Sequence, residues 1–186
     1  MRLFVGIHLA KDMVEEVNRF IQLDDQIMGP VHHGFKWTTP ENLHFTLKFF
    51  GEVPLSRLND INQALSRAVL HNEPFRLQLG KAGCFPSKGI PRIIWLGVAV
   101  GESQLTKLAD SIDNACLGYG FSKEDRPFSP HLTIARVKDS SPGVKFLEPK
   151  FQFTGDMIVE EVSLIESQLY PTGPVYRQVE KYRLQK

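Results

Sequence analysis

Apolar residues in the first half of the chain recur with two different periods, one typical of helices and one typical of strands. The helical stripes stop at turn-forming pairs such as Gly29-Pro30, and the strand-like runs are short and rich in β-branched and aromatic residues. The predicted elements are a strand over 3–10, a helix over roughly 11–27, strands over 36–38 and 43–50, and a helix over 55–69.

The second half repeats this alternation. A loop containing Gly83, Pro86, Gly89 and Pro91 separates its first two strands, and Ser103 is a candidate cap for its helix. The predicted elements are strands over 75–79 and 93–100, a helix with an apolar stripe over 105–116, and strands over 131–137, 151–155, 159–167 and 176–184. Such a mixture predicts an α+β fold. Because no linker or low-complexity segment interrupts it, we expect 1–186 to form a single bilobal domain.

Size and charge narrow the possible functions. The chain has 186 residues, a mass of 21.1 kDa and 42% hydrophobic residues, which suits one domain with its own core. Lys and Arg number 22 against 21 Asp and Glu, which leaves a formal charge of +1. This balance argues against a general DNA coat, and any contact with nucleic acid must come from a local basic patch that holds only a few nucleotides.

The cysteines and the amino-terminal sequence bear on the compartment. Cys84 and Cys116 lie far apart, in no Cys-x-x-Cys or zinc-finger spacing, and are expected to be free thiols in a reducing cytoplasm. The apolar run near the start is too short for a signal peptide, and no later run reaches the ~20 residues of a membrane span. We therefore expect a cytoplasmic protein without a membrane partner.

One short pattern occurs twice, as His44-Phe45-Thr46-Leu47 and as His131-Leu132-Thr133-Ile134. With six histidines in the chain, chance would supply only about 0.2 copies of His-x-Thr, so two copies with apolar flanks form a specific signal. Both copies fall on predicted strands. The repeat is therefore the main candidate for the chemistry of this protein.

Strand geometry explains the spacing, because residues two apart project from the same face. In the first copy His44, Thr46 and Lys48 are expected to share one face. Phe45, Leu47 and Phe49 are expected to anchor the opposite face in a core. Two such strands facing each other would place two imidazoles and two hydroxyls around one cleft.

Two histidines are what hydrolysis of a cyclic phosphodiester requires. A neutral imidazole can take a proton from water while a protonated one gives a proton to the departing sugar oxygen, and hydroxyls can bond the phosphate oxygens. Two other interpretations remain open: half-buried structural histidines, and a zinc site, although neither motif contains a third ligand. No role is assigned to the remaining histidines, His8, His32, His33 and His71.

The blocks around these motifs resemble a known family, the two-histidine phosphoesterases, and within it the bacterial and archaeal RNA 2′,3′-cyclic phosphodiesterases once called 2′-5′ RNA ligases. The resemblance extends over nearly the whole chain. It is carried by the opening strand and by the segments 36–52, 91–97, 126–136, 167–169 and 173–176. It implies a bilobal α+β fold with pseudo-twofold symmetry, an antiparallel sheet in each lobe and a central groove.

The resemblance also implies roles for individual residues. His44 matches the proton donor and His131 the proton acceptor, while Thr46 and Thr133 match the residues that hold the phosphate. Family members hydrolyse terminal RNA 2′,3′-cyclic phosphates to 2′-phosphomonoesters, and some join RNA ends through a 2′-5′ bond. Because two histidines supply both the acid and the base, no metal or other cofactor is expected. The expected partner is RNA with such an end, or a small cyclic nucleotide, and the chain is expected to act as a monomer.

Arg136 matches the arginine that closes the second block, and its guanidinium could bind phosphate or stack on a base. On a regular strand it would share the face of Leu132, so it reaches the groove only if the strand bulges. Lys48 could face the groove or be a solvated lysine at the strand end. Phe50, Phe128 and Tyr176 could stack on bases or belong to the core, and the sequence does not choose between them.

Two other functions use the same residues. The groove could join a 2′,3′-cyclic phosphate end to a 5′-hydroxyl end by 2′-5′ transesterification. Alternatively, the chain could be a non-catalytic module that binds nucleotides or RNA ends. A matched acid and base favour an enzyme over a binding module, and water at ~55 M favours hydrolysis over joining.

Overall fold

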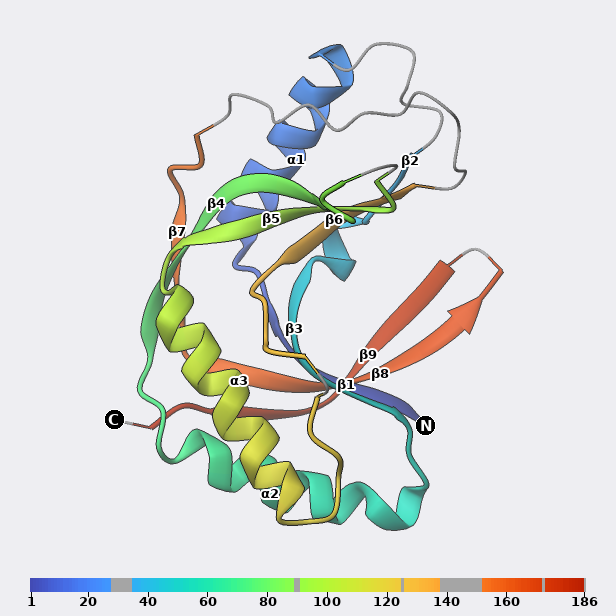
Figure 1. Cartoon of the computed structure of the whole chain (residues 1–186), viewed down its shortest axis with the longest axis vertical. Coiled ribbons are helices and arrows are strands. Elements are labelled where there is room, and N and C mark those ends of the chain that lie inside the picture. Colours follow the sequence, from blue (N-terminus) through green and yellow to red (C-terminus); the bar gives the residue numbers. More distant parts are fainter. Residues whose placement is uncertain (28–34, 89–90, 125, 138–151, 172, 186) are drawn as a thin grey trace.

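The computed structural model of the chain describes residues 1–27, 35–88, 91–124, 126–137, 152–171 and 173–185 (Figure 1). Gly29-Pro30, Gly89, His32 and His33 lie outside these residues. The three α-helices of the described part are α1 (Lys11–Ile27), α2 (Leu58–Val69) and α3 (Glu102–Leu117). The strands are β1 (Arg2–His8), β2 (Phe35–Trp37), β3 (His44–Glu52), β4 (Phe75–Phe85), β5 (Ile93–Val100), β6 (Leu132–Val137), β7 (Asp156–Val159), β8 (Glu161–Tyr170) and β9 (Gly173–Arg183).

These strands form one curled antiparallel sheet, so the α+β prediction is confirmed. The strand order is β7-β4-β5-β6-β3-β1-β8-β9, and β2, which is outside this order, also pairs with β6. Only one residue pair, Phe45 opposite Leu132, joins β3 to β6 in the described chain. The sheets expected in the two lobes are therefore the two halves of one continuous sheet, connected between the two His-x-Thr strands.

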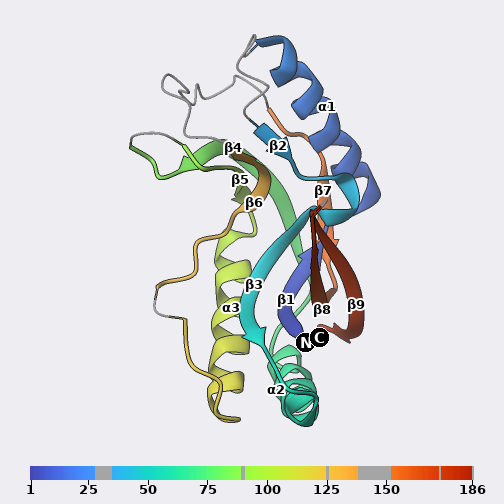
Figure 2. The same ribbon diagram turned by 90° about the vertical axis from the view of Figure 1, so that its right-hand side faces the viewer.

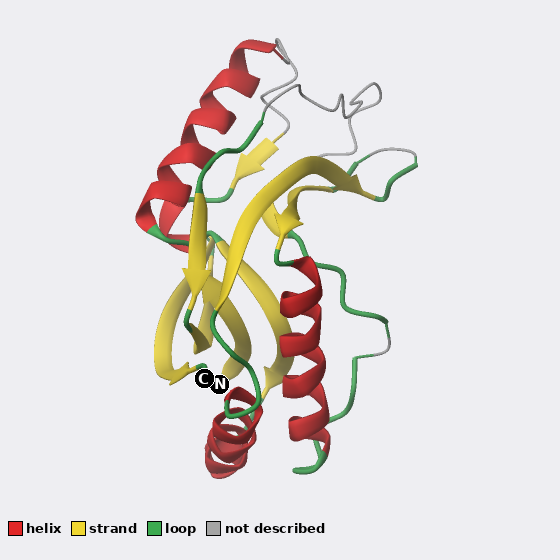
Figure 3. Ribbon diagram, turned by 90° about the vertical axis from the view of Figure 1, so that its left-hand side faces the viewer, coloured by secondary structure: helices red, strands yellow, loops and turns green. Residues whose placement is uncertain are grey.

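Helices α1 and α2 lie at opposite ends of the molecule, and α3 runs alongside the sheet (Figures 2 and 3). Views from opposite sides place α1 at one end and α2 at the other, with the curled sheet between them (Figures 2 and 3). Helix α1 buries Met13, Val17 and Phe20, and α2 packs against α3. No helix in the described part of the chain has the length and apolar character needed to span a lipid bilayer.

Most predicted boundaries agree with the structure to within a few residues, and three predictions are wrong. Helix α3 begins at Glu102 behind Gly101, which has a positive φ of 91°, so Ser103 lies inside the helix and is not its cap. Strand β4 continues through the predicted loop to Phe85, because Gly83 leaves room for the ring of Trp95 on β5.

The third wrong prediction is the strand over 151–155, whose described residues form no strand. The carboxylate of Glu16 on α1 accepts the backbone N–H groups of Thr154 at 2.8 Å and Gly155 at 3.1 Å. Phe153 packs its ring against Phe20, 5.3 Å between centroids. A side chain therefore replaces a neighbouring strand as hydrogen-bond partner, and the strand β7 begins only at Asp156.

Candidate active site

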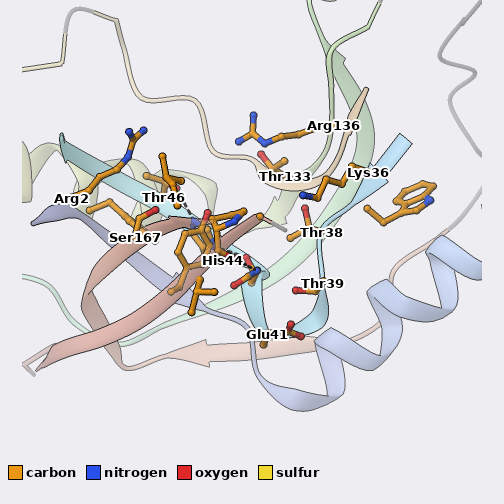
Figure 4. A pocket seen from close by; sticks show the side chains of 18 of the residues that line it. Arg2, Lys36, Thr38, Thr39, Glu41, His44, Thr46, Thr133, Arg136 and Ser167 are labelled. Atoms are coloured by element: carbon orange, nitrogen blue, oxygen red, sulfur yellow. Dashed lines mark hydrogen bonds between the residues drawn. The ribbon is translucent and has the colours of Figure 1, made fainter. Parts of the chain in front are cut away.

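A cleft of about 650 Å³ is lined by residues from both halves of the sheet. Figure 4 shows His44 near its centre. The lining includes all five site residues predicted from the sequence: His44, Thr46, His131, Thr133 and Arg136. The structure thus brings the two motifs together around one space, as the repeat predicted. Their chemical roles stay predictions.

The hydrogen bonds of His44 define its tautomer. Nδ1 lies 2.7 Å from the carbonyl oxygen of Asn42, and a carbonyl can only accept, so Nδ1 carries the proton. In the neutral ring Nε2 therefore presents a lone pair. Thr46 Oγ1, 3.1 Å away, donates to it. The reactive nitrogen of His44 and the hydroxyl of Thr46 are thus a hydrogen-bonded pair on one face of β3.

His131 has the same contact at Nδ1 in the other half of the sheet. Its Nδ1 lies 2.7 Å from the carbonyl oxygen of Ser129, again two residues upstream, so this ring also carries its neutral-state proton on Nδ1. The edge of Phe85 packs against it with centroids 5.3 Å apart. Both histidines therefore have Nδ1 held by their own chain and keep Nε2 for chemistry.

Aromatic rings enclose His44 more tightly than His131. Phe4 packs at 4.8 Å and Tyr176 at 5.1 Å between centroids, the latter edge-on. Burial lowers the pKa of His44 to about 4, and the positive charges of Arg136 and of other histidines act in the same direction, although the Asn42 carbonyl opposes them. In the protein alone His44 is therefore neutral at pH 7.

A one-residue bulge three residues after the histidine in each motif strand changes which side chains reach the cleft, and β3 has a second irregularity at Phe50. In β3, Val5 pairs with Lys48 and Gly6 with Thr46, so Leu47 is unpaired. Leu47 and Lys48 are consequently both buried, and the next residue, Phe49, enters the cleft with 43% of its surface exposed. The prediction that Phe49 faces the core was wrong, because the bulge reverses the alternation beyond Thr46.

The same irregularity occurs in β6. Ile94 pairs with Ala135 and Trp95 with Thr133, which leaves Ile134 unpaired. Arg136 is thereby turned out of the core and into the lining of the cleft. The bulge that Arg136 needed in order to reach the groove is present, at the same position after the histidine as in β3.

Lys48 does not face the cleft. Its side chain is 2% exposed and forms an ion pair with Asp113 on α3, while its Nζ donates to the carbonyl oxygen of Ser122 at 2.8 Å. Both earlier interpretations of Lys48, as a groove residue and as a solvated lysine, are wrong. Lys48 therefore connects the bulged strand β3 to helix α3 and to the segment that precedes His131.

The aromatic candidates separate clearly. Tyr176 lines the cleft, whereas Phe50 packs on Phe121 at 5.2 Å and Phe128 packs against the core. Sequence reasoning missed Phe49 and Arg2, whose guanidinium lies 4.9 Å from the centroid of the Phe49 ring. It also missed Lys36, which joins Arg2 and Arg136 in the lining. No sequence signal distinguishes Phe49 from Phe50, because only the bulge decides which of them is exposed.

The side chains in the cleft are suited to an anion more than to a metal ion. In the described part of the chain, no group of three or more His, Cys, Asp or Glu side chains is placed to hold a metal. Among the described residues of the lining, Arg2, Lys36 and Arg136 are cationic and Glu41 supplies the one carboxylate. Its pKa is lowered by its own backbone N–H and by Thr39, so it is ionised. In the described lining, cationic side chains therefore outnumber carboxylates.

Fold and cleft together define the class: an α+β protein with one His-x-Thr strand in each half of a curled antiparallel sheet. The chain belongs to the 2′-5′ RNA ligase superfamily, whose family model matches residues 14–170. The family resemblance stated from the sequence is thus confirmed.

Curated relatives cover nearly the full length of the chain. It is 36% identical over 179 residues to the RNA 2′,3′-cyclic phosphodiesterase of Archaeoglobus fulgidus, covering 95% of this chain and 97% of that protein. It is 35% identical to the Methanothermobacter thermautotrophicus protein of the same name, covering 99% of each.

Solved structures of similar proteins have the same fold over nearly the whole chain. The protein TT0787 of Thermus thermophilus superposes with a TM-score of 0.79 at 32% identity, over 99% of this chain and 98% of that one. The E. coli LigT complex with 3′-AMP gives 0.80 at 25% identity, over 100% and 98%.

Proposed function

We propose that this protein hydrolyses RNA 2′,3′-cyclic phosphate ends to 2′-phosphomonoesters. One observation carries the proposal: two imidazoles line one cleft, each with Nδ1 held by a carbonyl oxygen two residues upstream and Nε2 left for proton transfer. The relatives named RNA 2′,3′-cyclic phosphodiesterase support the same activity. A binding module would need hydrogen-bond donors for phosphate but no matched acid and base.

In the proposed reaction Nε2 of His131 takes a proton from water as the water oxygen attacks phosphorus opposite O3′. The bond between phosphorus and O3′ breaks, and His44 donates its Nε2 proton to O3′ as it leaves. The phosphate remains on O2′ and the 3′-hydroxyl is regenerated. Each positioned proton transfer contributes about 10²–10⁴-fold in rate. Thr46 and Thr133 hydrogen-bond the phosphate oxygens as charge develops on them.

His44 must be protonated to act as the acid, yet its pKa is lowered to about 4 in the protein alone. The substrate supplies the missing charge. A phosphate anion against Nε2 favours the imidazolium and offsets the repulsion from Arg136 and His131. We infer that the cyclic phosphate and a proton enter the cleft together, so that His44 becomes an acid only when a phosphate is bound.

The groups around the histidines would hold the rest of the nucleotide. Arg136 offers a fork of donors to phosphate oxygens from β6. Phe49 offers an exposed ring on which a base can stack, with Arg2 beside it. Because the site draws residues from both halves of the sheet, we propose that 1–186 works as one bilobal domain. One chain completes the cleft, which suits a monomer, and the free thiols Cys84 and Cys116 suit the cytoplasm.

Phosphorus NMR of adenosine 2′,3′-cyclic phosphate and of a cyclic-ended oligonucleotide tests the proposal. We expect conversion to the 2′-phosphomonoester, full activity in the presence of a metal chelator, and a loss of at least about 10²-fold in kcat for His44→Ala and for His131→Ala. His71→Ala is the matched control, since His71 is exposed and outside the cleft lining.

Near-normal turnover in either cleft variant would overturn the role given to that histidine. Adding an oligonucleotide with a 5′-hydroxyl and sizing the products distinguishes hydrolysis from 2′-5′ joining. Binding of a 2′-phosphate nucleotide with no turnover of any cyclic substrate would support a binding module instead.

A further inference from the structure

His131 has fewer restraints than His44. Strand β6 begins only at Leu132, so His131 lies just before the paired part of its strand, whereas His44 pairs with His8 on β1. In the described part of the chain the His131 ring has one hydrogen bond, from Nδ1 to the Ser129 carbonyl oxygen, and the His44 ring has two. A single hydrogen bond selects the nitrogen but leaves the plane of the ring free to swing about that bond. The orientation of His131 therefore needs a second support.

A ring from a different strand packs against His131. Phe85 lies at the end of β4, and β5 separates that strand from β6 in the sheet (Figure 1). The Phe85 ring nevertheless reaches His131, with 5.3 Å between the centroids and 88° between the ring planes. Phe85 is outside the lining of the cleft. It therefore contacts the imidazole without contributing to the surface that a bound molecule would touch.

Trp95 in turn packs on Phe85. The two ring centroids are 5.2 Å apart and the ring planes are inclined by 34°. Trp95 pairs with Gly83 on β4 and with Thr133 on β6, so it lies between the strand that carries Phe85 and the motif strand. A Cβ on Gly83 would lie 2.4 Å from Trp95 Cζ2, so the absence of a side chain there lets the indole lie against β4. Trp95, Phe85 and His131 thus form an aromatic row.

The position of Trp95 in this row has a cost in stability. Its Nε1 is buried and, among the described residues, has no hydrogen-bond partner. Burying an unpaired donor is unfavourable, and each such group in a folded protein requires an explanation. What Trp95 contributes at this position is therefore its large flat ring and not its N–H group. The ring contact with Phe85 uses that property.

We propose that Phe85, supported by Trp95, is a positioning residue for His131. The Ser129 carbonyl selects the Nδ1–H tautomer, and Phe85 fixes the plane of the ring so that Nε2 stays aimed into the cleft. This inference rests on the proposed function, because it takes Nε2 of His131 as the atom that removes a proton from water. Without Phe85 the ring swings and its hydrogen bond to Ser129 weakens. Part of the population then carries the proton on Nε2, where the nitrogen cannot act as a base.

A purely structural role for Phe85, limited to packing the end of β4, makes a different prediction. Such a role would lower the free energy of unfolding without changing the tautomer of His131. Phe50 provides the comparison, since its ring packs on Phe121 at 5.2 Å and 70° and is also outside the cleft lining. The same substitution at Phe85 and at Phe50 therefore distinguishes orientation of the base from a general loss of packing.

The kinetic experiment measures turnover of adenosine 2′,3′-cyclic phosphate. Phe85→Leu should lower kcat about tenfold and change KM less than about twofold, because a reacting group loses its orientation while the cleft lining stays intact. Phe50→Leu should change both constants less than about twofold.

Gly83→Ala tests the aromatic row from its other end. The new Cβ displaces the Trp95 ring, so kcat should fall by about threefold or more although no residue of the cleft is changed. Gly97→Ala is the matched control, since a Cβ on Gly97 would lie 3.4 Å from the same ring, an ordinary contact distance. An unchanged kcat in Gly83→Ala would overturn the part assigned to Trp95.

Nitrogen NMR of the histidine rings reads the tautomer independently of turnover. Long-range ¹H–¹⁵N spectra are recorded at about pH 8, where neutral imidazole predominates, and the His131 signals are assigned by their absence in His131→Ala. The wild type and Phe50→Leu should show the Nδ1–H tautomer of His131, and Phe85→Leu should show a mixture of both tautomers.

The outcomes separate the positioning role from the proposed function. An unchanged tautomer in Phe85→Leu, or an equal loss of kcat in Phe50→Leu, would overturn the positioning role and leave the proposed function standing. If the wild type turns over no cyclic substrate while the tautomer still changes in Phe85→Leu, the proposed function fails and Phe85 still orients His131.

Discussion

Phe49 and Arg136 occupy equivalent positions in the two halves of the molecule. Each lies five residues after its histidine, and each enters the cleft because a one-residue bulge at Leu47 or Ile134 reverses the strand alternation. The two halves thus use one backbone design to place different chemistry, an aromatic ring in one and a guanidinium in the other. A base and a phosphate are the groups that these two side chains suit.

We expect Phe49→Ala to weaken substrate binding and leave the fold nearly intact. Stacking on an aromatic side chain is worth about 1–3 kcal/mol per base, so KM should rise by about tenfold with a small change in kcat. Because Phe49 is 43% exposed, the free energy of unfolding should fall by less than about 1 kcal/mol. Steady-state kinetics on a cyclic-ended oligonucleotide and urea unfolding measure both quantities.

Phe50→Ala is the matched control for that variant. The Phe50 ring packs on Phe121. Phe50→Ala should therefore lower the free energy of unfolding more than Phe49→Ala does, and it should raise KM less. An unchanged KM in Phe49→Ala would contradict the stacking role.

The Lys48–Asp113 ion pair predicts an asymmetric response to mutation. The lysine side chain is 2% exposed and the aspartate 19%, so removing the aspartate leaves the more deeply buried charge without a counterion. Asp113→Ala should therefore lower the free energy of unfolding by about 3 kcal/mol, and Lys48→Met by less. In the double variant Lys48→Met, Asp113→Leu most of the stability should return. Equal losses in the two single variants, measured by urea unfolding, would disprove this ranking.

Strands β3 and β6 show which features of the site could be predicted from the sequence and which could not. Periodicity and the His-x-Thr repeat correctly placed both motifs on strands, and strand alternation holds for His44 and Thr46. It fails from Lys48 onward because the bulge depends on how β3 pairs with β1, and no residue type in the sequence signals it. Burial of Lys48 likewise depends on Asp113, which a different element supplies.

Local propensity also fails where a distant side chain replaces a backbone partner. The 151–155 segment has strand-like composition, but Glu16, far away in sequence, takes the N–H groups of Thr154 and Gly155. The opposite error occurs in β4, where Gly83 is typical of a loop but serves close packing against Trp95. Lys36 was predicted to lie on a strand, yet only the register of β2 against β6 reveals that it faces Arg136.

The threonines should contribute to the transition state through their hydroxyls and not through their shape. Thr46→Val keeps the branched side chain of the strand but removes the donor, and kcat should fall by about 10²-fold with little change in KM. Thr46→Ser keeps the donor and should retain most of the activity. Thr133→Val and Thr133→Ser should behave in the same way in the other half of the site. If the valine variants raised KM and left kcat unchanged, the hydroxyls would be binding groups for the ground state.

The depressed pKa of His44 makes folding stability depend on pH in a defined direction. Its pKa falls from an ordinary value of 6.5 to about 4, so between these values the unfolded chain binds the extra proton and the folded protein does not. The stability contribution is fully present above about pH 6.5 and is lost as the pH falls toward 4. At pH 4.5 the loss from this one group should be about 2 kcal/mol relative to pH 7.

His8, whose pKa is lowered by burial and by Lys181, adds a loss of the same sign. His44→Gln should therefore show a shallower decline than the wild type but not a flat one, as measured by urea unfolding at a series of pH values from 7 to 4.5. Superimposable curves for the wild type and His44→Gln would mean that His44 titrates alike in the folded and unfolded chain. The inference that a proton enters the cleft together with the cyclic phosphate would then have no support.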